Sequence, residues 1–89
     1  MISRVHPQFR RALERLPRDI QRRARHAYRR FRQDPSHPAL GFKPLHTSLP
    51  RWSVWISEFY RAVGVRKSDD EMVWFFIGTH ADYERLIAV

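Results

Sequence analysis

The sequence predicts an α+β domain in which an N-terminal helical hairpin packs on a small antiparallel β-sheet and a short helix ends the chain. Three observations predict this class. Apolar residues recur at helical spacing from Phe9 to about Gln33, and the period changes from 3.6 to 2 after Arg51. A dense apolar segment then runs from Met72 to Ile77, as expected of a strand that is buried on both faces.

Two helices are expected in the first third of the chain. Pro17 separates them, since proline suits the first turn of a helix but interrupts its interior. Asp34 precedes Pro35, which disfavours helical backbone and ends the second helix near Gln33. The first apolar face consists of Phe9, Ala12, Leu13 and Leu16, and the second of Ile20, Ala24, Ala27, Tyr28 and Phe31.

The sheet is expected to begin after a loop rich in Pro, Ser and His at 34–50, which contains one extended piece at 42–46. In the first meander strand, Trp52, Val54 and Ile56 alternate with Ser53, Trp55 and Ser57. Residues 60–66 and 71–78 form the next two strands, joined by a polar turn at 68–70. Thr79 is placed to cap the last helix with Asp82 three residues later. Residues 2–6 could add an edge strand. One sheet face is expected to stay partly open, because little chain is left to cover it.

Length and composition indicate a single domain, residues 1–89, that folds on its apolar residues alone. The chain has no cysteine, so neither a disulfide nor a thiolate metal site supports it, and a reducing, cytoplasmic location is expected. The longest apolar run is far shorter than the roughly 20 residues that a membrane span needs. The N-terminus lacks the continuous apolar run of a signal peptide.

Positive charge is concentrated at the N-terminal end. The net charge is +8, yet residues 1–32 alone hold eleven arginines and only two acidic residues. Such asymmetry points to a polyanion or an acidic protein as partner, and the arginine fork suits phosphate and carboxylate groups. A solvated helix face is the plainer interpretation. The predicted RNA-binding arginines are Arg18, Arg22, Arg25 and Arg29, which follow one face of the second helix.

The sequence contains few of the usual catalytic motifs. Its five histidines form no HxxxH or HxH pair, and its three glycines are too scattered for a phosphate loop. No metal or other cofactor is therefore expected. Four residues around the sheet remain as candidates, and each has a structural alternative such as solvation, salt bridging or core packing: Lys43, Arg61, His80 and Tyr83.

Together these four residues suit the cleavage of RNA without a metal. When a 2′-hydroxyl attacks the adjacent phosphate, the site must move protons and neutralise charge on phosphorus. Arg61 and Lys43 can supply cations, and His80 can transfer a proton near neutral pH. Tyr83 can stack on a base or donate a hydrogen bond.

At these residues the sequence resembles a known family, the RelE/ParE superfamily of type II toxin–antitoxin toxins. The resemblance covers roughly residues 7–88. It is carried by FRRALERLP at 9–17, DPSHPALGFKPLH at 34–46, WSVWISEFYRAV at 52–63 and WFFIGTHADYERLI at 74–87. It implies a helical hairpin on an antiparallel sheet and, for the RelE, YoeB and HigB branches, cleavage of mRNA on the ribosome.

The resemblance also implies roles for single residues and for partners. Arg61 matches an arginine that stabilises the cleaved phosphate, and His80 occupies the place of a general acid. Tyr83 matches an assisting tyrosine and Lys43 a lysine before the sheet. The implied partners are the ribosome with its mRNA and an acidic cognate antitoxin, with the toxin monomeric alone or hetero-oligomeric with that antitoxin.

Trp55 departs from the family pattern and keeps other functions open. Many relatives carry an arginine there, so Trp55 either removes one cation or replaces it with a stacking surface for RNA. Two alternatives follow: a ParE-like poison of DNA gyrase, and a catalytically degenerate module that only binds a partner or RNA. The His80 and Tyr83 pair favours the nuclease.

Overall fold

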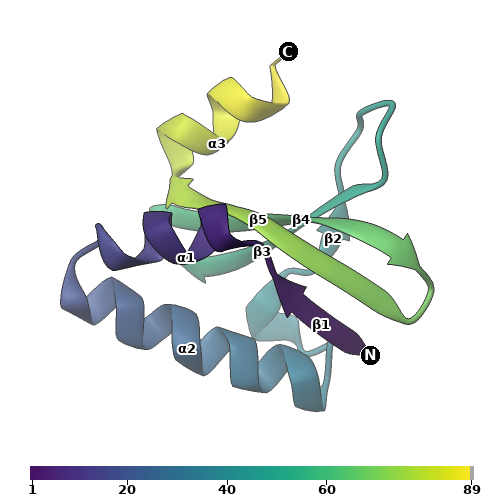
Figure 1. Cartoon of the computed structure of the whole chain (residues 1–89), viewed down its shortest axis with the longest axis horizontal. Coiled ribbons are helices and arrows are strands. Elements are labelled where there is room, and N and C mark those ends of the chain that lie inside the picture. The colour runs from purple at the N-terminus through teal and green to yellow at the C-terminus, as the bar shows by residue number, and fades with distance from the viewer. Residues whose placement is uncertain (89) are drawn as a thin grey trace.

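The protein is described here by a computed structural model of residues 1–88, in which three α-helices lie against a sheet of five strands (Figure 1). The helices are α1 (Pro7–Glu14), α2 (Arg18–Gln33) and α3 (His80–Ile87), and a single 3-10 turn, η1, covers Pro38–Leu40. The strands are β1 (Ile2–Val5), β2 (Lys43–Pro44), β3 (Arg51–Ser57), β4 (Tyr60–Ser68) and β5 (Glu71–Thr79). The predicted helical hairpin, three-stranded meander and terminal helix are all confirmed.

The sheet is mixed rather than purely antiparallel. Its strand order is β1-β5-β4-β3-β2, and the pairs β2–β3, β3–β4 and β4–β5 are antiparallel. The expected edge strand forms as β1 but runs parallel to β5, from the pair Ile2–Glu71 to the pair Val5–Trp74. A parallel neighbour needs a long crossover connection, and here the whole chain between β1 and β5 supplies it.

The main core lies between the helical hairpin and one sheet face. Phe31 is 1% exposed, and its ring packs edge-on against Phe42 and Trp74, with ring centroids 5.0 and 5.2 Å away. Val54 and Ala62 project from β3 and β4 into the same core. The alternation predicted for β3 is confirmed on this side, since Trp52, Val54 and Ile56 all pack against the core.

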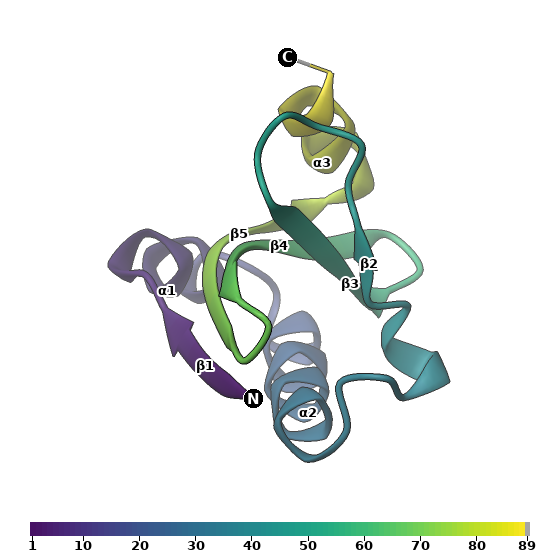
Figure 2. The same ribbon diagram turned by 90° about the vertical axis from the view of Figure 1, so that its right-hand side faces the viewer.

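The opposite sheet face is only partly covered. Figure 2 shows α1 and α2 on one side of the sheet, with α3 and the β2–β3 loop on the other. Ser53 and Val63, which are cross-strand partners, are buried there, and so is Tyr83 of α3. The second side of the sheet thus has a small buried patch near α3 and open surface beyond it.

The ends of the helices follow the local sequence. The His6 side chain accepts a hydrogen bond from the Gln8 N–H, with Pro7 at the first helical position of α1. Thr79 Oγ1 accepts from the Asp82 N–H, which confirms the predicted cap of α3. Capping satisfies N–H groups that have no partner within the helix, and it fixes the position at which α3 leaves β5. No helix in residues 1–88 is long and apolar enough to cross a membrane.

Candidate functional site on the open sheet face

Three residues in one row across the sheet define the centre of the candidate site. Trp55 of β3 lies opposite Arg61 of β4, and Arg61 lies opposite Gly78 of β5. Residues directly opposite each other in antiparallel strands share a sheet face. A Cβ built on Gly78 would lie 3.5 Å from the Asp82 Cβ, so this face is the one over which α3 begins. Arg61 therefore projects from the open face, beside the first turn of α3.

The Arg61 side chain fixes the turn between β3 and β4. Its Nη1 donates to the backbone carbonyls of Ser57, Glu58 and Tyr60, at 2.7, 3.1 and 3.0 Å. A guanidinium has five N–H donors, two of them on Nη1. Nε and Nη2 are therefore the nitrogens with which Arg61 could engage a phosphate.

His80 begins α3 at the same corner of the sheet. Its backbone N–H donates to the Phe59 carbonyl at 2.7 Å, which ties the start of α3 to the turn that Arg61 holds. The imidazole is exposed, with Nδ1 3.5 Å from Glu84 Oε1. Its ring centroid lies 5.8 Å from that of Tyr83, which is buried. The Arg61 side chain and the His80 backbone are thus bonded to the same turn, whereas Tyr83 packs beneath His80 instead of presenting its ring to solvent.

Lys43 lies farther from this corner. It is exposed on β2 and lies opposite Ser53, in the row next to that of Trp55. Lys43 and Arg61 are separated by two strand spacings of about 4.8 Å and by two residues along the strands, so their backbones lie about 12 Å from each other. Lys43 is within reach of a neighbouring phosphate rather than of the one that Arg61 would hold.

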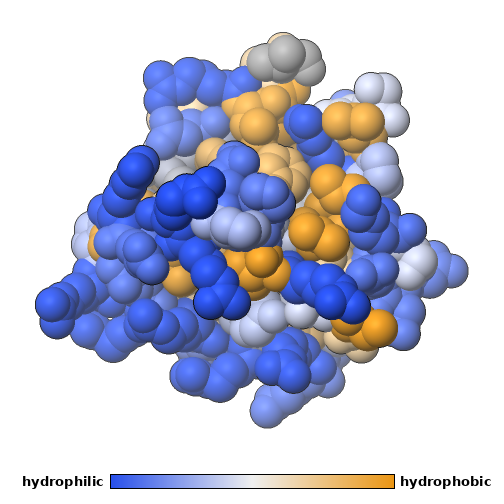
Figure 3. Space-filling view, in the orientation of Figure 1, coloured by the Kyte–Doolittle hydropathy of each residue, from blue (hydrophilic) through white to orange (hydrophobic). Residues whose placement is uncertain are grey.

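The predicted RNA-binding residues gather in a basic depression between α2 and the end of β3. It has a volume of about 790 Å³, and Trp55 lies at its margin with 45% of its surface exposed. Figure 3 shows hydrophilic residues covering the α1–α2 side of the molecule, and apolar ones along β5 and α3. The basic residues that line the depression are Arg22, Arg23, Arg25, His26, Arg29 and Arg30. Arg18 is exposed on α2 but does not line it.

Comparison with protein families decides the family of this chain. Residues 18–85, more than half of the chain, match the model of the ParE-like toxin domain. The chain belongs to the ParE-like toxin family. It is accordingly a toxin of the type II toxin–antitoxin class, with the RelE/ParE fold. No protein with a curated description matches the sequence of this toxin.

Solved structures with the same fold come from bacteria and an archaeon. The YoeB/ParE toxin of Agrobacterium tumefaciens is 16% identical, with a TM-score of 0.69 over 90% of this toxin and 99% of that chain. The RelBE2 toxin–antitoxin complex of Mycobacterium tuberculosis matches at 22% identity with a TM-score of 0.70, over 89% of this toxin and 96% of that chain. The RelE–RelB complex of Pyrococcus horikoshii matches at 17% identity with a TM-score of 0.67, over 88% of this toxin and 92% of that chain.

Sequence reasoning missed Arg51, a further cation on the open face of the toxin. Its guanidinium carbon lies 5.6 Å from the Phe75 ring centroid, and its Nε is buried without a hydrogen-bond partner among the residues that the structure describes. Arg51 lines a groove of about 660 Å³ between the β2–β3 loop and α3, together with His46 and Arg85. Its place two residues before Ser53, on the same strand face, was the signal that could have identified it.

Asp82 offsets part of this positive charge at the start of α3. Arg85 forms a hydrogen bond and ion pair with its carboxylate. That hydrogen bond, followed by one with Thr79, holds the pKa of Asp82 below its ordinary value of 3.8. Arg85 is therefore engaged within α3, and the other cations described on this face include Lys43, Arg51 and Arg61.

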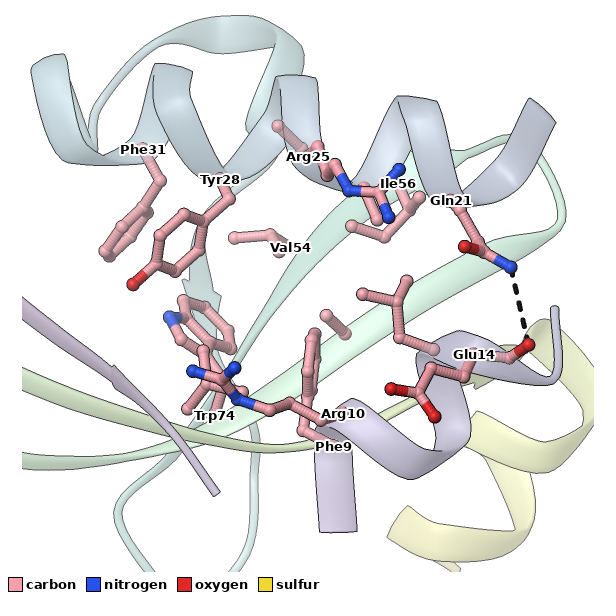
Figure 4. A pocket seen from close by; sticks show the side chains of 15 residues that line it. Phe9, Arg10, Glu14, Gln21, Arg25, Tyr28, Phe31, Val54, Ile56 and Trp74 are labelled. Carbon is pink, nitrogen blue, oxygen red and sulfur yellow. Dashed lines mark hydrogen bonds between the residues drawn. The ribbon is translucent and has the colours of Figure 1, made fainter. Parts of the chain in front are cut away.

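A third hollow lies between the helical hairpin and the sheet. This cavity of about 360 Å³ is enclosed by α1, α2 and the sheet, and apolar side chains such as Phe9, Val54 and Trp74 form most of its wall (Figure 4). Arg10 and Arg25 stand at its rim, as Figure 4 also shows. None of the four predicted catalytic residues lines it.

The described residues contain no cluster suited to a metal ion. Within residues 1–88, no group of three or more His, Asp or Glu side chains comes together at metal-binding distance.

Proposed function

We propose that this toxin is a metal-independent endoribonuclease that cuts mRNA on the ribosome. The observation that carries the proposal is that the Arg61 side chain and the His80 backbone are bonded to one turn, at one corner of the sheet. Arg61 is anchored through Nη1 to the β3–β4 turn, and the His80 N–H is bonded to the same turn. A cation and a proton-transfer group attached to one turn are the two kinds of group that phosphodiester cleavage without a metal requires.

In the proposed reaction, the 2′-oxygen of the RNA forms a bond to the adjacent phosphorus while the bond from phosphorus to the 5′-oxygen breaks. Arg61 neutralises the charge that develops on the phosphoryl oxygens. His80, oriented by Glu84, gives its proton to the departing 5′-oxygen. The 2′-hydroxyl proton leaves to solvent or a base, and the products carry a 2′,3′-cyclic phosphate and a 5′-hydroxyl.

The other predicted residues support this reaction from outside its centre. Lys43 binds a flanking phosphate, and Arg18, Arg22, Arg25 and Arg29 attract the RNA backbone by charge. Tyr83 acts as a positioning residue, since its buried ring packs against the imidazole of His80.

The test uses purified ribosomes that hold a defined mRNA, with the toxin added. We expect fragments ending in 2′,3′-cyclic phosphate, no cut where a single 2′-deoxynucleotide replaces the attacking ribose, and loss of cutting in His80→Ala and Arg61→Ala. Lys67→Ala removes the other lysine, which is exposed on β4, and is the matched control. Cutting at the deoxynucleotide, or full activity in His80→Ala, would contradict the proposal.

A gyrase poison is the second candidate. Two observations favour it: the matching family model is that of ParE-like toxins, and the three carbonyl contacts of Arg61 give that residue a structural role that needs no catalysis. Broken DNA trapped on gyrase in toxin-treated cells, with ribosomal mRNA intact, would support this candidate over the nuclease.

We also propose an acidic antitoxin as the protein partner. Two of the similar structures are toxin–antitoxin complexes. The +8 net charge favours an acidic partner. The cavity beneath the hairpin combines apolar walls with Arg10 and Arg25 at the rim, which suits an amphipathic acidic segment.

Arg10→Glu should weaken the complex with the antitoxin and spare ribosome-dependent cutting, because Arg10 lies on the other side of the sheet. Action on ribosome-bound mRNA would place the toxin in the cytoplasm.

A further inference from the structure

The indole of Trp55 lies flat on the backbone of Gly41. A Cβ built on Gly41 would lie 2.6, 2.7 and 2.8 Å from Cδ2, Cε2 and Cε3 of the indole. Cδ2 is a fused ring atom with bonds in every in-plane direction, so such a close approach can come only from above or below the ring. Gly41 therefore covers one face of the indole, and no residue with a side chain could take its place without moving the ring.

The backbone at this position favours glycine for a second reason. Gly41 ends η1 with φ of 53°, in the left-handed region that side chains disfavour. The same glycine thus ends the turn and forms a flat seat for the indole. With one face seated and 45% of the residue exposed, Trp55 presents a rigid aromatic surface to solvent.

Guanidinium groups lie on one side of this surface and the proposed reaction centre on the other. Trp55 lines the basic depression together with Arg22, Arg25 and Arg29 of α2. Its direct cross-strand partner is Arg61, and cross-strand Cβ atoms are about 5 Å apart. A nucleotide stacked on Trp55 would thus have its phosphate between the α2 arginines and Arg61.

We infer that Trp55 is a base-stacking platform for single-stranded RNA, and that it sets which nucleotide presents its phosphate to Arg61. Proteins that bind single-stranded nucleic acid without sequence preference combine an open aromatic face with a basic groove in this way. An acidic peptide could pair with the same arginines, but it has no base to stack on the exposed indole and would gain little binding energy from it. The part of this inference that concerns Arg61 rests on the proposed nuclease function, whereas the stacking itself does not.

The first test measures binding with RNA that cannot be cut. A fluorescent 2′-O-methyl octanucleotide is titrated with wild-type toxin, Trp55→Ala and Trp55→Phe at fixed salt. Stacking of one base contributes about 1–3 kcal/mol, so Trp55→Ala should bind roughly 5- to 150-fold more weakly. Trp55→Phe should recover most of the affinity. Equal binding by wild type and Trp55→Ala would overturn the inference.

A second comparison separates stacking from charge. An oligomer of the same length with abasic sites keeps every phosphate, so wild type should bind it about as weakly as Trp55→Ala binds the complete oligomer. Trp55→Ala should barely distinguish the two oligomers. If the affinity of both proteins fell by the same factor on the abasic oligomer, residues other than Trp55 would contact the bases, which would overturn the inference. If Trp55→Ala weakened binding of a poly-glutamate peptide but not of RNA, the surface would be a peptide site.

Gly41→Ala and Ile2→Ala complete the design. Gly41→Ala displaces the ring while it retains the tryptophan, so it should lower RNA affinity in the same direction as Trp55→Ala. Ile2→Ala removes an exposed apolar side chain of β1, far from the basic depression, and should bind the methylated oligomer as well as wild type. Trp55-dependent binding together with intact mRNA on toxin-treated ribosomes would leave the platform standing and refute the nuclease. Efficient cutting of ribosome-bound mRNA that is unaffected by Trp55→Ala would refute the role of Trp55 in placing the phosphate and leave the nuclease standing.

Discussion

At the scale of single residues, Arg61 combines a structural and a proposed chemical role. One guanidinium nitrogen satisfies three backbone carbonyls at the β3–β4 turn, and the others remain available to a phosphate. A guanidinium can bond the turn through Nη1 and a phosphate through Nε and Nη2, whereas lysine has only one nitrogen to serve both. Replacement of Arg61 is therefore expected to lower both stability and activity. Replacement of His80, whose side chain is exposed, is expected to lower activity alone.

Substitution of Arg61 by lysine should reveal this coupling. Arg61→Lys should lower the free energy of unfolding by about 1–2 kcal/mol, because carbonyls at the half-buried turn lose charge-assisted donors, and it should also abolish cutting. His80→Ala should abolish cutting with an unchanged unfolding midpoint. Urea denaturation and the ribosomal cutting assay on the same preparations measure both effects. An Arg61→Lys variant with full stability would show that the three contacts matter little.

The pKa of Asp82 provides a second prediction at this scale. Arg85 is the larger cause of its lowered pKa and Thr79 the smaller, so Arg85→Ala should raise the pKa more than Thr79→Ala does. A carboxyl whose pKa is lower in the folded state contributes stability above its unfolded pKa and loses it as pH falls through the folded value. The contribution should thus disappear below about pH 4. NMR titration of the Asp82 side-chain carbon measures the shift, and an unchanged pKa in Arg85→Ala would contradict it.

At the scale of elements, α3 is positioned by its first residues. Thr79 caps it, and the His80 N–H bonds the β3–β4 turn. Such short-range contacts decide where a helix of eight residues begins, since so short a helix has little stability of its own. The place of His80 beside Arg61 therefore depends on the cap as well as on the sheet.

Removal of the cap should weaken both stability and activity. Thr79→Ala should lower the free energy of unfolding by about 1 kcal/mol, as is typical for loss of an N-cap, and should reduce cutting because α3 frays at His80. Thr79→Ser keeps the hydroxyl and is the matched control. Thermal unfolding followed by circular dichroism and the cutting assay test this pair. Equal behaviour of the two variants would mean that packing of Tyr83 alone holds α3.

At the scale of the whole molecule, one face of α2 packs on the sheet and the other carries the charge. Phe31, Ala24 and Ala27 face the core, whereas the arginines between them face solvent. The apolar stripe thus holds the helix against the sheet, and the basic stripe is left to bind a polyanion.

Loss of the principal core contact should affect the entire domain. Phe31→Ala should lower the free energy of unfolding by about 3–5 kcal/mol, a large fraction of the 5–15 kcal/mol that is usual for a domain. Phe31→Leu fills more of the space than alanine does, so it should lower the free energy of unfolding by less than Phe31→Ala. Urea unfolding monitored by tryptophan fluorescence distinguishes them. A loss below 1 kcal/mol in Phe31→Ala would argue against the packing of Phe31 between Phe42 and Trp74.

Charge on α2 should govern the salt dependence of RNA binding. Each neutralised phosphate contributes about −0.7 to the slope of log affinity against log salt for a single strand, so replacing Arg22, Arg25 and Arg29 by alanine should make the slope shallower by about two. The matched control removes three exposed charges elsewhere: Arg11, Arg15 and Lys67. If both triple variants changed the slope equally, binding would depend on net charge and not on this face of α2.

Patterns of residue type within one element were enough to predict the elements themselves. Helical spacing ended near Pro17 and Asp34, and the alternation of Trp52, Val54 and Ile56 placed β3 with its inner face toward the core. Patterns of this kind are local, because burial of one face of a helix or strand imposes its period on consecutive residues. The direction of β1 could not be predicted in this way, since pairing with β5 depends on how the intervening chain folds.

The sequence by itself determined the α+β class, the helical hairpin, the meander, the cap of α3, the basic face of α2 and the likeness to RelE/ParE toxins. Only the tertiary structure decided that Arg61 and His80 share one turn, that Tyr83 is buried, that Arg51 faces the open groove, and that Gly41 seats Trp55. The physical reason is the range of the interactions. Periodicity, capping and net charge arise between near neighbours or from composition, whereas a site arises where strand register brings distant residues together.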